Sequence, residues 1–324
     1  MTFYPLKLTP VAKTAIWGGE RLRRDWGKKS DLPNVAETWE LTVRKNENNT
    51  IQNGPQKGST LASVLELWGP AAIGTNHKGD HFPLLVKFID ANDRLSVQVH
   101  PDDPYAAAVE NDLGKTEMWY VVEADEGAEL MMGLKAGVTK EDFAKAIADG
   151  DPEPLLCHVP VKAGDCFFIP AGMPHAIGRG ILVAEIQQNC DLTYRVFDYN
   201  RRDKDGNLRE LHVEKAVAVT HPFTQAEVDA IRFAKGCPEE DLVACPYFTV
   251  KKVDLKDTYT GSVEADSFLS LLCLSGSGEL ESGNTVVPFK KGDSLFLAAN
   301  SGFFRLKGTA ELLFSKFNKS TFVY

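Results

Sequence analysis

The chain has 324 residues, of which 43% are hydrophobic and 25% charged, and its formal net charge is −9. This composition predicts a soluble globular protein, and the acidic balance without a basic block excludes nucleic acid as an expected partner. No apolar run is long enough to span a membrane, and the N-terminus lacks the pattern of a signal peptide. The six cysteines are scattered without CxxC pairs, which indicates a reducing, cytoplasmic location.

Short strands separated by glycine-rich turns dominate the predicted secondary structure. In chain order, the expected strands are 82–90, 95–100, 117–123, 181–187, 193–199, 248–254, 268–274 and 311–316. Helices are expected at 61–67 and 104–111. A third helix should begin after Thr139, because Thr139 and Asp142 form a capping-box pattern, and should end at Gly150. Such a chain favours a small β-barrel over an α/β sheet.

A repeated segment divides the chain into two related halves, as its length also suggests. Residues 159–165 (VPVKAGD) align without a gap with residues 287–293 (VPFKKGD), and five of the seven positions are identical. In each copy a Gly-Asp turn leads into a short buried strand. The copies then diverge, because His175 in the first corresponds to Phe303 in the second. If His175 coordinates a ligand, only the first half carries a working site.

The segment LSVQVH, which ends at His100, alternates strictly and places Ser96, Gln98 and His100 on one face. A solvated polar face would explain this alternation. However, the nearly apolar segment before it indicates burial, and buried polar groups need partners. Glu117, at the start of the next expected strand, and His175 complete a set of two nitrogens and two oxygens. A set made of Gln98, His100, Glu117 and His175 would suit Zn²⁺, Fe²⁺ or Mn²⁺ with one position open for substrate.

Several motifs resemble those of known families. The spacing of Gly164, Pro170, Gly172 and His175 is similar to the second conserved motif of the cupin superfamily. Five further segments resemble type I mannose-6-phosphate isomerases, particularly the short bacterial form: residues 16–19, 82–87, 95–103, 114–119 and 191–201. This similarity spans most of the chain, although the second half matches mainly as a degenerate cupin.

The resemblance implies a mainly β fold of two tandem cupin domains, each a jelly-roll β-barrel. Residues 1–235 would form a catalytic cupin domain with a small helical insertion around 104–157. Residues 236–324 would form a degenerate cupin domain without a metal site. The resemblance also implies one zinc ion, with Mn²⁺, Co²⁺ or Fe²⁺ as alternatives, held by Gln98, His100, Glu117 and His175.

The same resemblance implies an aldose–ketose isomerase that interconverts D-mannose 6-phosphate and D-fructose 6-phosphate through an enediol. The phosphorylated hexose is then the expected partner. Arg195 and Lys115 are the expected catalytic residues, and Ser96 is expected beside Lys115 in the phosphosugar pocket. Trp17 and Tyr199 could wall the sugar, although core packing would explain both residues equally well.

Other functions remain open at this point, namely an isomerase for another phosphosugar, an iron-dependent cupin oxygenase and a non-catalytic sugar-phosphate binder. The two cations Lys115 and Arg195 favour an anionic substrate over the apolar substrate of an oxygenase. The proton-transfer base stays open between Lys115, Glu185 and a metal-bound water. Of the remaining histidines, His77 and His81 are interpreted as loop residues, and His158 as the entry to a strand. His212 and His221 are interpreted as surface or hinge residues. A monomer or a homodimer is expected.

Overall fold

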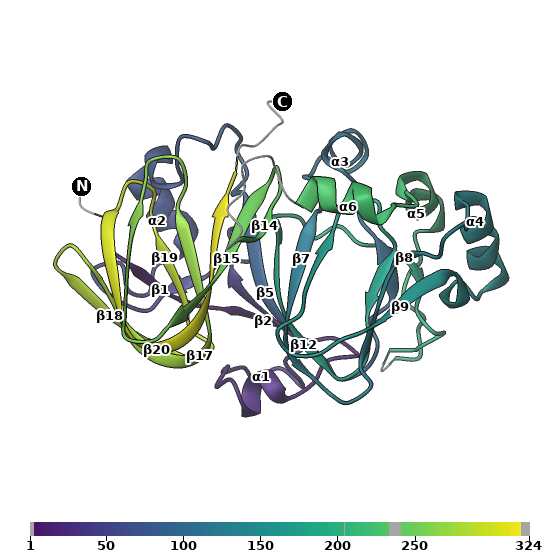
Figure 1. Cartoon of the computed structure of the whole chain (residues 1–324), viewed down its shortest axis with the longest axis horizontal. Coiled ribbons are helices and arrows are strands. Elements are labelled where there is room, and N and C mark those ends of the chain that lie inside the picture. Colours follow the sequence, from purple (N-terminus) through teal and green to yellow (C-terminus); the bar gives the residue numbers. More distant parts are fainter. Residues whose placement is uncertain (1–2, 204, 233–240, 319–324) are drawn as a thin grey trace.

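The computed structural model describes residues 3–203, 205–232 and 241–318. The chain is folded mainly into antiparallel strands, which form three sheets arranged in two lobes (Figure 1). The strands are rich in β-branched and aromatic residues, which fit a pleated, half-buried surface. The expected mainly β fold is therefore confirmed.

The first lobe consists of two sheets that face each other. One has the order β10 (Cys166–Ile169), β7 (Glu117–Ala124), β12 (Ile181–Gln188), β5 (Leu84–Ala91), β3 (Glu37–Leu41) and β2 (Val11–Lys13). The other has the order β13 (Tyr194–Phe197), β6 (Val97–Val99), β11 (His175–Ile177), β8 (Glu129–Leu134) and β9 (Leu156–Pro160). Among the described residues neither sheet closes on itself by hydrogen bonds, so the expected barrel is built from two packed sheets.

The second lobe is built on one sheet of nine strands. Its main path is β14 (Asp241–Ala244), β15 (Phe248–Leu255), β20 (Gly302–Phe317), β17 (Leu269–Ser282), β19 (Ser294–Leu297), β1 (Leu6–Thr9) and β4 (Thr50–Ile51). The strand β16 (Thr258–Val263) pairs with β20, and β18 (Thr285–Lys290) pairs with β17. Because β1 pairs with β19, opposing Leu6 to Phe296, the first strand of the chain belongs to the lobe formed mostly by its second half.

Helices lie around the sheets (Figure 1). They are α1 (Arg21–Arg24), α2 (Leu61–Trp68), α3 (Asp103–Glu110), α4 (Lys140–Asp149), α5 (Val213–Val219) and α6 (Gln225–Arg232), with 3-10 turns η1 (Pro70–Ala72) and η2 (Glu153–Leu155). The expected capping box of α4 is confirmed, since Thr139 and Asp142 bond each other's backbone amides, and Gly150 ends the helix with φ 82°. None of the described helices is both long and apolar enough to span a membrane.

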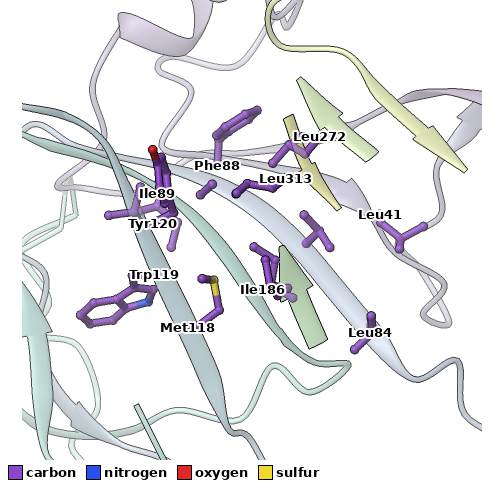
Figure 2. Close-up of a cluster of buried hydrophobic side chains, with 14 of the residues drawn as sticks. Leu41, Leu84, Phe88, Ile89, Met118, Trp119, Tyr120, Ile186, Leu272 and Leu313 are labelled. Atoms are coloured by element: carbon purple, nitrogen blue, oxygen red, sulfur yellow. The ribbon is translucent and has the colours of Figure 1, made fainter. Parts of the chain in front are cut away.

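One buried apolar cluster continues from the first lobe into the second. Figure 2 shows Phe88 and Ile186 of the first lobe in the same cluster as Leu272 and Leu313 of the second, and all four are at most 1% exposed. Burial of such side chains stabilises the fold by about 1.5–3 kcal/mol each. The two lobes therefore share a core, and this core holds the sheets that carry the site in a fixed relative position.

The eight expected strands and three expected helices all occur, although β17 and β20 extend far beyond 268–274 and 311–316. The expected domain boundary between residues 235 and 236 lies outside the described residues. The expected insertion around 104–157 contains α3 and α4, but it also supplies β7 and β8 to the two sheets of the first lobe.

Candidate active site

The four residues predicted as metal ligands come together between the two sheets of the first lobe. Gln98 in β6 pairs with His175 at the start of β11, and His100 follows directly after β6. Glu117 begins β7 in the facing sheet. His100, Glu117 and His175 are at most 1% exposed, and one candidate ligand atom from each lies within 4.8 Å of the others. The Gln98 side-chain amide nitrogen lies 3.4 Å from His175 Nε2.

Backbone carbonyl groups orient both imidazoles. His100 Nδ1 donates to the carbonyl oxygen of Leu192 at 2.8 Å, and His175 Nδ1 donates to that of Met173 at 2.8 Å. Each Nε2 is therefore left as an acceptor. His175 Nε2 lies 3.3 Å from one carboxylate oxygen of Glu117, and His100 Nε2 lies 3.7 Å from the other. Histidines that bind metals are commonly held in this way by a bond from the other ring nitrogen.

The electrostatics of this group fit a divalent cation. Burial lowers the pKa of His175 to about 4 and holds that of His100 well below its usual range, so both rings are neutral at pH 7. Burial, reinforced by Glu185, raises the pKa of Glu117 to about 7. Neither carboxylate oxygen of Glu117 has a hydrogen bond of good geometry. Two neutral imidazoles and a buried carboxylate are the donors that a divalent metal requires, and Lys115 is the cation that pairs with this carboxylate in the structure.

A cavity of about 390 Å³ adjoins this group, and five of the predicted site residues line it: Trp17, Ser96, Gln98, Lys115 and Arg195. Lys115 lies closest to the ligand group, because its Nζ is 2.9 Å from Glu117 Oε2 and 3.0 Å from His100 Nε2. The cavity thus connects the candidate metal ligands to a set of polar and charged side chains.

Arg195 is fixed on β13 directly beside β6, where it pairs with Gln98. Its Nε donates to Ser96 Oγ at 3.1 Å, and its Nη1 donates to the carbonyl oxygen of Glu210 at 3.0 Å. Burial, followed by repulsion from Arg209, lowers the pKa of Arg195. A guanidinium keeps its charge through such a shift, so Arg195 presents a permanent positive charge to the cavity.

A buried ion pair forms another part of the cavity wall. Lys87 of β5 and Glu185 of β12 pair across the sheet, with Lys87 Nζ 3.2 Å from Glu185 Oε1. The indole of Trp119 donates to Glu185 Oε2 at 2.8 Å. Burial alone would lower the pKa of Lys87, but Glu185 and Glu37 outweigh it and raise the value. Burial alone would raise the pKa of Glu185, but Lys87 and Lys115 outweigh it and lower the value, so both partners are ionised.

The chain is similar to known proteins along most of its length. Residues 6–136 match the model of the type I phosphomannose isomerase catalytic domain, and residues 239–317 match that of the mannose-6-phosphate isomerase cupin domain. The mannose-6-phosphate isomerase ManA of Bacillus subtilis is 40% identical over 322 residues, which cover 97% of this chain and 99% of that protein. The chain belongs to the mannose-6-phosphate isomerase family. A mannose-6-phosphate isomerase of Streptococcus mutans is 39% identical over 323 residues, with 97% and 99% covered.

A solved structure of this family agrees with the fold. The crystal structure of the mannose 6-phosphate isomerase from Bacillus subtilis superimposes with a TM-score of 0.86 at 38% identity, covering 96% of this chain and 99% of that one. Membership of the mannose-6-phosphate isomerase family confirms the expected resemblance and the cupin-type fold. Together with the group of His100, Glu117 and His175, it supports a divalent metal.

Several residues that line the cavity were not among the predicted site residues, and His212 and Arg209 are two of them. His212 was interpreted as a surface or hinge residue, but it lines the cavity, and its backbone amide donates to the Arg195 carbonyl oxygen at 2.7 Å. Arg209 also lines the cavity. Its Nε donates to Asp198 Oδ2 at 2.7 Å, and its Nη2 also contacts this carboxylate. No local pattern marks either residue, because a long loop returns them to β13.

Tyr199 is not among the residues that line this cavity. It follows the end of β13 in the left-handed region, with φ 55°, and this turn directs the ring elsewhere. The guanidinium carbon of Arg94 lies 3.9 Å from the ring centroid, and Phe197 packs against the ring edge.

The second lobe has no counterpart of the candidate metal ligands among the described residues. Across the part of the chain that the structure describes, His100, Glu117 and His175 form the one cluster of histidine, cysteine or acidic side chains that could hold a metal. Phe303, which corresponds to His175 in the repeat, is 63% exposed, whereas His175 is fully buried. The repeated turn itself is retained, since Gly164 and Gly292 both have a positive φ, of 94° and 86°. The two copies thus share a turn and strand but not the buried polar group.

Proposed function

We propose that the protein interconverts D-mannose 6-phosphate and D-fructose 6-phosphate, with one Zn²⁺ held by Gln98, His100, Glu117 and His175. The observation that supports this most strongly is the buried His–Glu–His group beside a cavity lined by several cations. Two imidazoles, one carboxylate and one amide oxygen are ligands that zinc accepts with a position left open. Family membership supports the reaction, because the relatives named above carry the name of this isomerase.

When bound, the zinc ion supplies a Lewis acid for the sugar oxygens at C1 and C2. Arg195 is proposed to stabilise negative charge that develops on these oxygens, since it is fixed by Ser96 and remains protonated. Lys115, which contacts Glu117 and His100, supplies a second positive charge on the ligand side of the cavity. Trp17 is proposed to contact the carbon face of the sugar.

Glu185 is the proposed base that moves the proton between C1 and C2. It lines the cavity, and its lowered pKa keeps it ionised and able to accept a proton. Lys87 is poorly suited to that role because its raised pKa keeps it protonated. Its ammonium group instead holds the Glu185 carboxylate in position from the neighbouring strand.

Arg209 is the proposed partner of the substrate phosphate. The guanidinium is anchored through Nε and Nη2 to Asp198, which is 5% exposed, and the Arg209 side chain lines the cavity. Arginine suits phosphate because its planar donors match the phosphate oxygens. Arg201 is less suited to this role, because it binds Asp198, Asp93 and the Arg94 carbonyl and does not line the cavity.

A coupled assay of mannose 6-phosphate conversion tests this proposal. The protein is assayed as purified, after chelation, and after separate addition of Zn²⁺, Mn²⁺, Co²⁺ and Fe²⁺. The expected result is activity that is lost on chelation and restored best by zinc. Metal binding without conversion of mannose 6-phosphate would instead indicate another phosphosugar. Oxygen consumption by the iron-loaded protein, without isomerisation, would indicate an oxygenase.

We further propose a cytoplasmic location and a monomer or homodimer. The described cysteines are all free, which suits a reducing compartment. Cell fractionation and light scattering after size-exclusion chromatography test these two points.

A further inference from the structure

A second cavity, which the proposed reaction does not use, lies where the two lobes meet. It has a volume of about 550 Å³ and is lined by residues from segments 8–10, 26–29, 50–58 and 290–293. Segment 26–29 follows α1, which lies between the lobes in Figure 1. Segment 290–293 is the repeated turn of the second lobe. Cavities of this size are typical of small-molecule sites.

Positive charge is concentrated around this cavity. Its lining includes Lys28, Lys29, Lys57, Lys290 and Lys291, whereas Asp293 is the one acidic residue among the described residues that line it. Asp293 is already paired with a lysine outside the lining, since Lys7 Nζ lies 2.6 Å from its Oδ2. A chain with a net charge of −9 therefore gathers lysines from three separate segments at one place. We call this cavity the lysine cleft.

Two of these lysines form a fixed part of the cleft. Lys28 is 7% exposed, and its Nζ lies 2.5 Å from Glu40 Oε1 and 2.5 Å from the carbonyl oxygen of Gly292. Lys291 Nζ lies 4.1 Å from the centroid of the buried Trp26 ring. The buried contacts of Lys28 thus hold the floor from both lobes, whereas the Lys291 side chain is 38% exposed and also pairs with Glu123, so a ligand would meet a partly preformed surface.

The ammonium groups of the other three lysines form no ion pair among the described residues. Lys29, Lys57 and Lys290 are all exposed. Like charges around one cavity repel each other, and a bound anion removes this repulsion. Lysine ammonium groups on flexible stems adapt readily to phosphoryl oxygens.

We propose that the lysine cleft binds a small compound that carries two or more phosphoryl groups. The ligand would contact Lys29, Lys57 and Lys290 and join the two lobes. This inference is independent of the proposed isomerase reaction, because none of these lysines lines the active-site cavity.

Isothermal titration calorimetry with inorganic pyrophosphate tests the proposal. The cleft variant K29M/K57M/K290M is compared with a control variant, K78M/K256M/K316M, which removes the same charge from exposed lysines outside the cleft. We expect the cleft variant to bind pyrophosphate about tenfold more weakly than the parent, and the control to bind within about twofold. The melting temperature of the parent and control, but not of the cleft variant, should rise with pyrophosphate.

Three results would overturn the proposal. An equal loss of affinity in both variants would mean that the net charge alone decides binding. Unchanged affinity in the cleft variant would place the anion elsewhere, for example at Arg195 and Arg209. No binding by the parent protein at millimolar pyrophosphate would exclude the site. A circular dichroism spectrum identical to that of the parent shows that each variant is folded.

Discussion

Replacing Arg209 by methionine separates phosphate recognition from the chemistry of isomerisation. Methionine retains the apolar stem of Arg209 and removes the guanidinium that faces the cavity. A hydrogen bond to a charged group contributes about 1.5–3 kcal/mol. Its loss should therefore lower kcat/KM for mannose 6-phosphate by about 10- to 150-fold. Most of this change should be a rise in KM, since the phosphate is held equally in the ground state and the transition state.

The Arg201→Met variant is the matched control. Arg201 also binds Asp198, at 2.5 Å, but it does not line the cavity. Both variants remove one arginine partner from the same buried carboxylate, and Arg201→Met also removes the bonds to Asp93 and the Arg94 carbonyl, so it should lose at least as much stability in urea denaturation as Arg209→Met. Steady-state kinetics with measured metal content distinguishes them: Arg209→Met should raise KM, and Arg201→Met should leave it nearly unchanged. Equal KM values for the two variants, or a fall in kcat alone for Arg209→Met, would refute the assignment.

His175→Gln should weaken metal binding by more than about 10- to 100-fold, because that is the loss expected when a residue that only orients a metal ligand is removed. Full metal content by elemental analysis would show that His175 is not a ligand. Arg195→Ala should keep its metal and lose kcat by about 100-fold or more, and unchanged kinetics would contradict its role. Lys28→Met should destabilise the protein by about 3–5 kcal/mol in urea denaturation, because it leaves the fully buried Glu40 carboxylate without its cation. Adding Glu40→Gln should recover part of this loss. An unaltered urea midpoint of the Lys28→Met variant would disprove the buried pair. Burial alone would raise the pKa of Asp198, but bonds from two arginines lower it. Its stabilisation is therefore present above about pH 4, the pKa of an unfolded aspartate, and is lost as the pH falls further. The stability difference between the parent and Asp198→Asn should shrink as the pH falls below about 4, and a constant difference would contradict this.

The sequence predicted those parts of the site that short-range patterns encode. Gln98 and His100 are marked by strict alternation along one strand, and His175 by a turn whose glycine and proline spacing is local. Glu117 could be added because it begins the next strand along the chain. The structure then brings these residues together through the packing of two sheets.

Residues positioned by long-range contacts could not be predicted in the same way. Arg209 and His212 reach the cavity because the loop after β13 returns to Asp198 and to the Arg195 backbone, and neither contact has a periodic signature. Tyr199 was expected on a continuing strand, but β13 ends at Phe197, before the left-handed turn. The full length of β17 was missed for a related reason, since Gly276 and its small neighbours resemble a turn yet pair with β20.

The placement of β1 has a consequence for the order in which the protein is made. Leu6 pairs with Phe296, which leaves the ribosome 290 residues later. At about 5–20 residues per second, β1 waits about 15–60 s for β19, although β4, its partner on the other edge, is made early. The strands of the first lobe, in contrast, all lie between residues 11 and 197, so all of them are made well before synthesis ends.

A polypeptide that stops before β19 can therefore contain every strand of the active-site lobe, while β1, which pairs with β4 along one edge, lacks its partner along the other. Leu6 and Leu8 of this strand, which are at most 2% exposed in the full chain, would then lose the cover that β19 and the rest of the second lobe provide. Exposed strand edges of this kind promote aggregation. A chain that lacks β19 thus exposes an aggregation-prone strand edge in β1, at the opposite end of the chain from the missing segment.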